Sequence, residues 1–422
     1  MRCSWLSFIH TADIHIGAFS HTPLRRAPLE AFKTIVDLAL SEGEKVLVIA
    51  GDLFESPRVG HELTIETVRT LKRAKREGLE VIVTPGSHDL TVKGHGTLAL
   101  LSEVGLVKIT ESIESEFKLK LKPTIAYNLR FYGIPGFKGG REVEYLESRR
   151  VEYGDFNSSY DNVLIAHVGL DLGALDLSKI SPKYSVIKLS REAQKSIHKH
   201  FKYIALGHIH FPVPYNESFE ANIAYPGAPI GRDASDIFET YKLRKTFNTD
   251  RRVLHVKLDG RIPKVKALKN SFNLGVDVVE INSPSEAIAT VKSRLKDIPE
   301  KFKCLIVFTG KVDFEKYSRI RKYVEEEAKK YGAWTHIIHS EVSDEYVQLL
   351  EEFKADLTNI EAIELEAIGN LIRKYGIKTQ PQKILELINV LGREYPEGAK
   401  KTVFDEEVIE EVMKILEEII GR

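Results

Sequence analysis

Cysteine, an excess of charge of either sign and long hydrophobic runs are all missing or nearly missing from this sequence. Cys3 and Cys304 are the only cysteines among 422 residues, which argues against a disulfide scaffold and against a zinc site built from thiolates. The formal net charge is +0, so a surface that binds nucleic acid has to be a local patch. Neither a signal peptide nor an apolar stretch of membrane-spanning length is visible. We therefore expect a cytoplasmic protein with no membrane partner.

The length and the order of the apolar segments indicate an α/β protein with more than one domain. A chain of 422 residues exceeds what one ordinary hydrophobic core accommodates. Near the N-terminus, almost uniformly apolar strands alternate with amphipathic helices, a pattern typical of a parallel sheet. The expected strands are Trp5–His10, Lys45–Ala50 and Glu80–Val83, and the expected helices are Pro28–Ser41 and Glu62–Glu77.

Shifts of periodicity and composition divide the chain into three regions. Alternation between 117 and 137 indicates antiparallel strands, Asn162–Ala166 is a further apolar strand, and Arg252–Leu258 completes the first region. A Lys-rich segment at 260–273 marks the boundary, and a β-α-β-α-β pattern follows from 276 to 338. The remainder is strongly charged and almost entirely helical. We therefore predict a first domain at 1–262, a small α+β domain at 270–343 and a helical C-terminal region at 344–422.

Five short motifs rich in histidine and aspartate each end an apolar strand or lie just past one. They are Asp13-x-His15, Gly51-Asp52, Gly86-Ser87-His88-Asp89, His167 and Gly207-His208-x-His210. In parallel α/β sheets, ligands bind beyond the carboxyl ends of the strands, and two residues at i and i+2 in extended backbone point the same way. Imidazoles and carboxylates without thiolates suit manganese, iron or zinc. An aspartate between two such ions can bridge them for phosphoester hydrolysis.

With these motifs the sequence resembles the calcineurin-like metallophosphoesterase superfamily, whose pattern is D-x-H, G-D, G-N-H-[DE], H and G-H-x-H. The resemblance implies two divalent metal ions, most often manganese. It assigns the first metal to Asp13, His15, Asp52 and His210, and the second to Asp52, Ser87, His167 and His208. It also implies that His88 assists the leaving oxygen or the transition state, with Asp89 orienting it. His10, by contrast, is expected to close its strand as a structural histidine.

Within the superfamily the sequence is most similar to the SbcD/Mre-type nucleases of DNA double-strand-break repair. The likeness rests on His10–Gly17, Ile49–Phe54, Ala205–His210 and Tyr225-Pro226-Gly227-Ala228, with Arg232 beyond. It implies a metallophosphoesterase sheet sandwich flanked by helices, a small α+β capping domain and a C-terminal helical region. That region would dock on an SbcC/Rad-type coiled-coil ABC ATPase. The resemblance also implies a homodimer that acts on DNA as a manganese-dependent 3′-5′ exonuclease and single-strand endonuclease.

Two residues depart from the family pattern and keep other functions open. Ser87 stands where the family has a metal-binding Asn, and a hydroxyl is a shorter and poorer neutral ligand than an amide oxygen. Glu55 stands where some relatives carry a His close to the substrate phosphates, and an anionic side chain there is less welcoming to DNA. The alternatives are therefore a scaffold subunit that has lost the second metal, or a small-molecule phosphodiesterase on the same fold.

Overall fold

The chain divides into two compact units, Met1–His339 and Ser340–Arg422. The computed structural model describes residues 6–90, 96–115, 117–137, 140–173, 175–177, 184, 186–310, 312–339, 368, 372, 379–391, 409–416 and 418. In the second unit the described helices are α11 (Pro381–Leu391) and residues 409–416, so most of the expected C-terminal helical region lies outside the described residues. Within the described part of the chain, the helices are too short or too polar to span a membrane.

A seven-stranded sheet in the first unit carries three of the five motifs. In spatial order its strands are β14 (Ser218–Glu220), β17 (Lys264–Lys269), β16 (Arg252–Lys257), β1 (Ser7–Thr11), β2 (Val46–Ala50), β3 (Glu80–Thr84) and β4 (Lys108–Ile109). Strands β1 to β4 run parallel, and β2 is buried along its whole length. Its continuous Val-Leu-Val-Ile-Ala run is what a strand covered on both faces requires.

A five-stranded sheet packs face to face against the first and carries the other two motifs. Its strands, in order, are β15 (Ile223–Ala224), β13 (Tyr203–Gly207), β10 (Asp161–His167), β8 (Leu129–Ile134) and β7 (Thr124–Ala126). A core that includes Phe8, Val48, Phe131, Ile165 and Tyr203 fills the space between the sheets. The remaining strands of this region form two small sheets, β5 (Ser112–Glu114) with β6 (Leu119–Leu121) and β9 (Val151–Tyr153), and β11 (Leu170–Asp171) with β12 (Ile187–Lys188).

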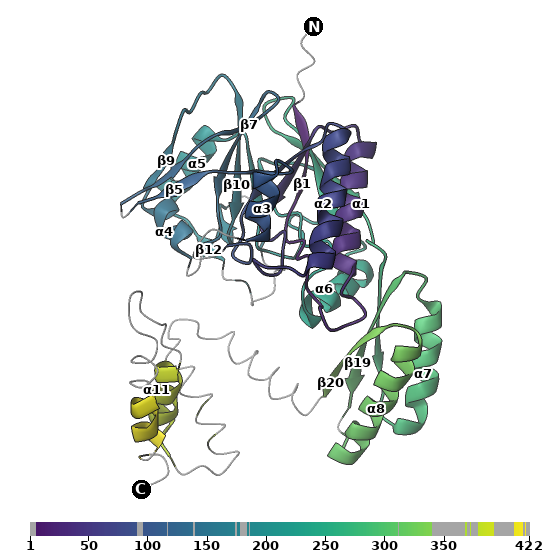
Figure 1. Cartoon of the computed structure of the whole chain (residues 1–422). Helices are drawn as coiled ribbons and strands as arrows, with labels where there is room; N and C mark the ends of the chain where they lie inside the picture. The colour runs from purple at the N-terminus through teal and green to yellow at the C-terminus, as the bar shows by residue number, and fades with distance from the viewer. Residues whose placement is uncertain are drawn as a thin grey trace. The chain divides into compact units, whose positions relative to one another are not determined.

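Helices cover both outer faces of this pair of sheets. On the seven-stranded side lie α1 (Ala27–Ser41), α2 (His61–Arg76) and α3 (Thr97–Glu103), with α1 and α2 side by side in Figure 1. On the five-stranded side lie α4 (Arg141–Glu147) and α5 (Arg191–His200). Buried Leu29, Phe32, Ile35 and Val36 form the stripe of α1 that contacts the sheet, at the helical spacing seen in the sequence.

Residues 274–339 form the small α+β region. Its elements are β18 (Leu274–Glu280), α7 (Pro284–Asp297), β19 (Phe302–Thr309), α8 (Phe314–Lys330) and β20 (Trp334–His339), with the three strands parallel in chain order. Both helices pack together over one face of the sheet. The predicted fold class, a sheet sandwich flanked by helices with a small α+β region, is confirmed.

The segment expected as a boundary contains an additional strand of the sandwich. Lys264–Lys269 is β17, which pairs antiparallel with β16 along its full length. Val265 and Ala267 point inward between exposed lysines, so the strand alternates as a half-buried strand should. The first sheet therefore extends beyond residue 262, where the first region was expected to end.

Candidate metal centre

The motif residues lie in tight turns just past the strand ends, and these turns bring two aspartates together. Asp13, His15, Asp52 and His208 have φ values of 54°, 53°, 50° and 86°, a region that residues other than glycine rarely adopt. The amide of Asp13 donates to the Gly51 carbonyl at 3.0 Å, and the amide of His15 donates to the Asp52 carbonyl at 3.0 Å. Such unusual backbone concentrates at functional sites, and here it joins the turn after β1 to the turn after β2.

Gly51 is required by the close approach of the second sheet. Its φ is +90°, and a Cβ added there would lie 2.0 Å from Nδ1 of His167. Any other residue would clash with the His167 ring. The Gly-Asp pair in the sequence is therefore a steric requirement of the site as well as a motif.

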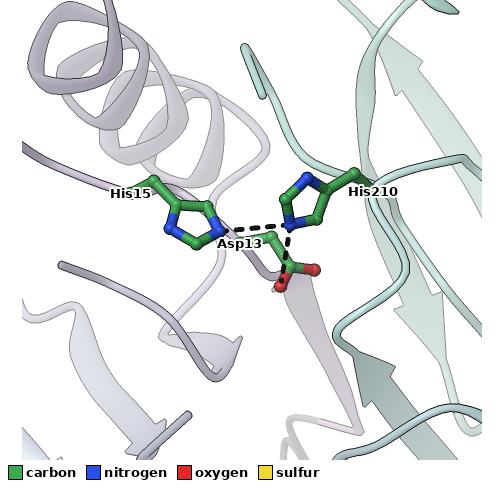
Figure 2. A group of neighbouring side chains, drawn as sticks. All are labelled: Asp13, His15 and His210. Atoms are coloured by element: carbon green, nitrogen blue, oxygen red, sulfur yellow. Dashed lines mark hydrogen bonds and ion pairs between the residues drawn. The ribbon is translucent and has the colours of Figure 1, made fainter. Parts of the chain in front are cut away.

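Asp13, His15 and His210 form one compact group of possible metal ligands. Figure 2 shows the two rings converging above the Asp13 carboxylate, with the Nε2 atoms of His15 and His210 3.1 Å apart. Nε2 of His210 lies 3.8 Å from Oδ1 of Asp13, and Nε2 of His15 lies 3.8 Å from Oδ2 of Asp52. All four side chains are buried or nearly so.

Asp13, Asp52 and His167 form a second group. Nε2 of His167 lies 3.2 Å from Oδ2 of Asp52, and its Nδ1 donates to the carbonyl of Ala50 at 3.0 Å. The same Asp52 oxygen therefore lies between His15 of the first group and His167 of the second.

Burial and mutual charge shift the pKa values of these groups in opposite directions. Burial raises the pKa of the Asp13 carboxyl, against the effect of His210 and His167. Burial also acts to raise the pKa of Asp52, but His167, His15 and His88 outweigh it and hold that pKa below its usual range. Burial acts to lower the pKa of His167, but Asp52 and Asp13 outweigh it and raise the pKa to about 10. In His208, burial prevails and lowers the pKa to about 4.

The donor set and its geometry fit a divalent cation. His210 Nδ1 donates to Oδ2 of Asp236 at 2.7 Å, and Nδ1 of His15 lies 2.8 Å from Oε2 of Glu55. With Nδ1 of His210 donating to one carboxylate and Nδ1 of His15 lying close to another, the Nε2 atoms of the two rings face each other. Two lone pairs at 3.1 Å repel unless a proton or a metal ion lies between them. Metal-binding histidines in proteins are typically oriented by such acceptors.

Two further predicted site residues, His208 and Ser87, lie outside the two compact groups. The His208 ring lies 5.4 Å from the His167 ring, centre to centre, and its amide donates to Asp13 at 3.0 Å. It is not a member of either compact group. Ser87 lies partly exposed in the turn between Gly86 and His88. The assignments of Ser87 and His208 to a second metal stay predictions, as do the assignments of the other ligands to their metals.

His88 and Asp89 differ from the expected pair in their contacts. Nδ1 of His88 donates to the Glu55 carbonyl at 2.8 Å, and Nε2 accepts from the Arg232 guanidinium at 2.7 Å. The Asp89 carboxylate instead accepts the amides of Gly86, Leu53 and Phe54. Asp89 thus fixes the backbone of the turn, and the partner that orients the His88 ring is the Glu55 carbonyl. Burial raises the pKa of Asp89 to about 7, with Asp52 adding to the shift.

His10 has the structural role expected of it. It is fully buried, and its Nδ1 lies 3.1 Å from the Tyr203 hydroxyl of the facing sheet. Burial lowers its pKa to about 3.

Two residues of the site were not found from the sequence. Asp236, in the first turn of α6 (Ala234–Lys245), accepts from His210 and from the amide of Arg232. Arg251 is buried and donates to the carbonyls of His210 and Asp236 and to the Thr240 hydroxyl. The available signal was Asp233, whose side chain caps α6 by accepting the amide of Asp236.

The sequence is similar to those of several curated proteins. A DNA double-strand break repair protein Mre11 of Methanopyrus kandleri is 27% identical over 227 residues, covering 52% of this chain and 48% of the relative. Mre11 of Archaeoglobus fulgidus is 29% identical over 232 residues, covering 53% and 50%, and Mre11 of Aeropyrum pernix is 25% identical over 299 residues, covering 66% of each. The chain is similar to Mre11 proteins. The resemblance to Mre-type proteins predicted from the sequence motifs is thus confirmed.

The likeness has limits in extent. The first two matches span about half the length of those relatives. No protein-family model matches the chain. A solved dimetal phosphatase from Danio rerio aligns with a TM-score of 0.27 and 12% identity, covering 53% of this chain and 86% of that one, which is too weak to support an argument.

Proposed function

We propose that this protein is a manganese-dependent DNA nuclease of double-strand-break repair, with 3′-5′ exonuclease and single-strand endonuclease activity. The observation that carries the proposal is the shared carboxylate: Oδ2 of Asp52 lies 3.2 Å from Nε2 of His167 and 3.8 Å from Nε2 of His15. A carboxylate between two groups of ligands suits a two-metal hydrolase. The similarity to Mre11 proteins supports DNA as the substrate.

Each metal has a proposed set of ligands. Asp13, His15, Asp52 and His210 would hold the first ion, and Asp52, Ser87, His167 and His208 would hold the second. Two ions held by these residues would supply an activated water and would neutralise charge that develops on the phosphate. The histidines must be neutral to bind, so proton release accompanies metal binding.

His88 and Arg232 would act on the phosphodiester itself. The guanidinium of Arg232 lies 2.7 Å from Nε2 of His88, and both side chains are partly exposed, at 38% and 25%. A planar guanidinium suits a phosphate. Once Arg232 binds the substrate phosphate, Nε2 of His88 is free to carry a proton toward the departing sugar oxygen.

The proposed setting of the enzyme is a cytoplasmic complex with an SbcC/Rad-type coiled-coil ABC ATPase. The predicted docking helices fall at 344–422, mostly outside the described residues. We also propose a homodimer, formed through α2. Leu71 of that helix is buried on its own chain, and Ile65 is 51% exposed.

The test is manganese-dependent degradation of a 3′-labelled DNA duplex by the full chain, beside its His88→Ala and Asp52→Asn variants. We expect degradation by the unmodified protein and its loss in both variants. Hydrolysis of a small phosphodiester without any action on DNA would favour the small-molecule enzyme. An inert protein that becomes active as Ser87→Asn would favour the scaffold, since the lost amide ligand would then account for the lost activity.

A further inference from the structure

Each histidine of the two ligand groups has an oxygen atom close to its Nδ1 atom. For His210 the acceptor is the Asp236 carboxylate, at 2.7 Å, and for His167 it is the Ala50 carbonyl, at 3.0 Å. For His15 the nearby oxygen is Oε2 of the Glu55 carboxylate, at 2.8 Å, a close contact without hydrogen-bond geometry. The Nε2 atoms of the three rings lie close to other atoms of the ligand groups, and of the three Nδ1 contacts only that of His15 is with a partly exposed side chain.

We propose that Glu55 is a positioning residue that holds His15 in the orientation required for metal binding. The inference rests on the proposed metal centre and goes beyond it. The negative charge of Glu55 serves the metal site, and the unfavourable effect on DNA expected from the sequence is secondary. Its carboxylate would fix the Nδ1–H form of His15 and raise the basicity of Nε2, as carboxylates do for other metal-binding histidines.

The backbone and a neighbouring cation hold Glu55 in place. Its amide donates to the Ile16 carbonyl at 3.1 Å, next to the bridge between Ile16 and Phe54. Its second oxygen, Oε1, lies 3.6 Å from the Arg232 guanidinium. The side chain is 27% exposed, whereas that of His15 is fully buried. A carboxylate fixed from both ends can impose one orientation on the ring.

An alternative role for Glu55 is as a ligand of a further ion, because His15, Glu55 and His88 also form a compact group. The position of Arg232 argues against this role. Its guanidinium lies 2.7 Å from His88 Nε2 and 3.6 Å from Glu55 Oε1, so a cation of the protein already neutralises this group. A metal ion there would have to displace the guanidinium.

The expected consequence is a loss of metal affinity. Removal of an acceptor that orients a metal-binding histidine typically costs about 10–100-fold in affinity. We therefore expect Glu55→Ala to weaken the tighter manganese site by about 10–100-fold with an unchanged number of ions per chain. Glu55→Gln keeps an oxygen that can accept from Nδ1 but loses the charge, so its loss should be smaller.

The experiment is calorimetric titration of the full chain with manganese chloride. The matched control is Glu44→Gln, because Glu44 is also a buried carboxylate beside a histidine, 2.7 Å from Nε2 of His255. Glu44 precedes β2, at the end opposite Asp52, so its replacement should leave manganese affinity unchanged. Thermal unfolding of each variant establishes that it is folded.

Each outcome decides the proposal. The proposal is supported if manganese affinity is lowest in Glu55→Ala, intermediate in Glu55→Gln and highest in the unmodified protein, and if Glu44→Gln binds manganese as the unmodified protein does. Equal affinity in Glu55→Ala overturns it, and so does the loss of one ion per chain, which would make Glu55 a ligand. If the unmodified protein binds no manganese, the proposed function fails, whereas binding that ignores residue 55 removes only this inference.

Discussion

Replacement of Gly86 by alanine tests how tightly the turn after β3 is fitted to Asp52. A Cβ at Gly86 would lie 2.1 Å from Oδ1 and 2.4 Å from the amide nitrogen of Asp52. Neither side can yield freely, because Oδ1 accepts from the His88 amide at 2.9 Å and the Gly86 amide donates to Asp89 at 3.0 Å. Forcing a methyl group into such a contact typically costs about 1–3 kcal/mol. At ~2–4 °C per kcal/mol for a domain of this size, the melting temperature should fall by about 2–12 °C.

The same change should weaken manganese binding, because the Asp52 carboxylate has to move. The control is Gly60→Ala, since a Cβ at Gly60 meets nothing within 4 Å. Thermal unfolding and a manganese titration are measured on both variants. If Gly86→Ala matches Gly60→Ala in melting temperature and in manganese affinity, Gly86 is not tightly fitted against Asp52.

Three further predictions concern the buried ionisable side chains His167, Arg251 and His10. Because the pKa of His167 is raised to about 10 by Asp52, the ring is protonated near pH 7. Manganese binding should therefore release about one proton per chain, seen as a buffer-dependent binding enthalpy; an enthalpy independent of the buffer would contradict this. Arg251→Met should lower the free energy of unfolding by roughly 3 kcal/mol or more, because the His210 carbonyl and its other acceptors lose a charged donor; urea denaturation measures it, and a loss below about 1 kcal/mol would contradict it. The pKa of His10 is lowered to about 3 by burial, so its contribution is complete above the unfolded value of about 6.5 and is lost as the pH falls. His10 alone should lower the free energy of unfolding by about 2 kcal/mol between pH 7.5 and pH 5, and His10→Gln should reduce the measured pH difference by about that amount.

The sequence predicted well those helices and strands whose pattern of buried residues can be read from the local order of apolar and polar residues. The continuous apolar run of β2 and the periodic stripe of α1 gave the strand and helix almost residue for residue. The strand ends then placed Asp13 and Asp52 at one edge, because parallel strands end together.

Elements with a mixed pattern were missed for physical reasons. Helix α6 buries Asp236, Glu239 and Thr240, so it has no apolar periodicity for the sequence to display. Strand β17 alternates Val265 and Ala267 with lysines. Because the segment is rich in lysine, the alternation of apolar and polar residues was not recognised as that of a strand. The contacts of Arg251 depend on the tertiary fold alone, since no local pattern predicts which carbonyls a buried arginine will meet.

The most direct test of the two-metal centre is the number of manganese ions bound per chain. Calorimetric titration should give two ions, the weaker at the site that contains Ser87, and Ser87→Asn should tighten that weaker site alone. A single ion per chain, unchanged by Ser87→Asn, would contradict the assignment of Asp52 as a carboxylate shared by two metals.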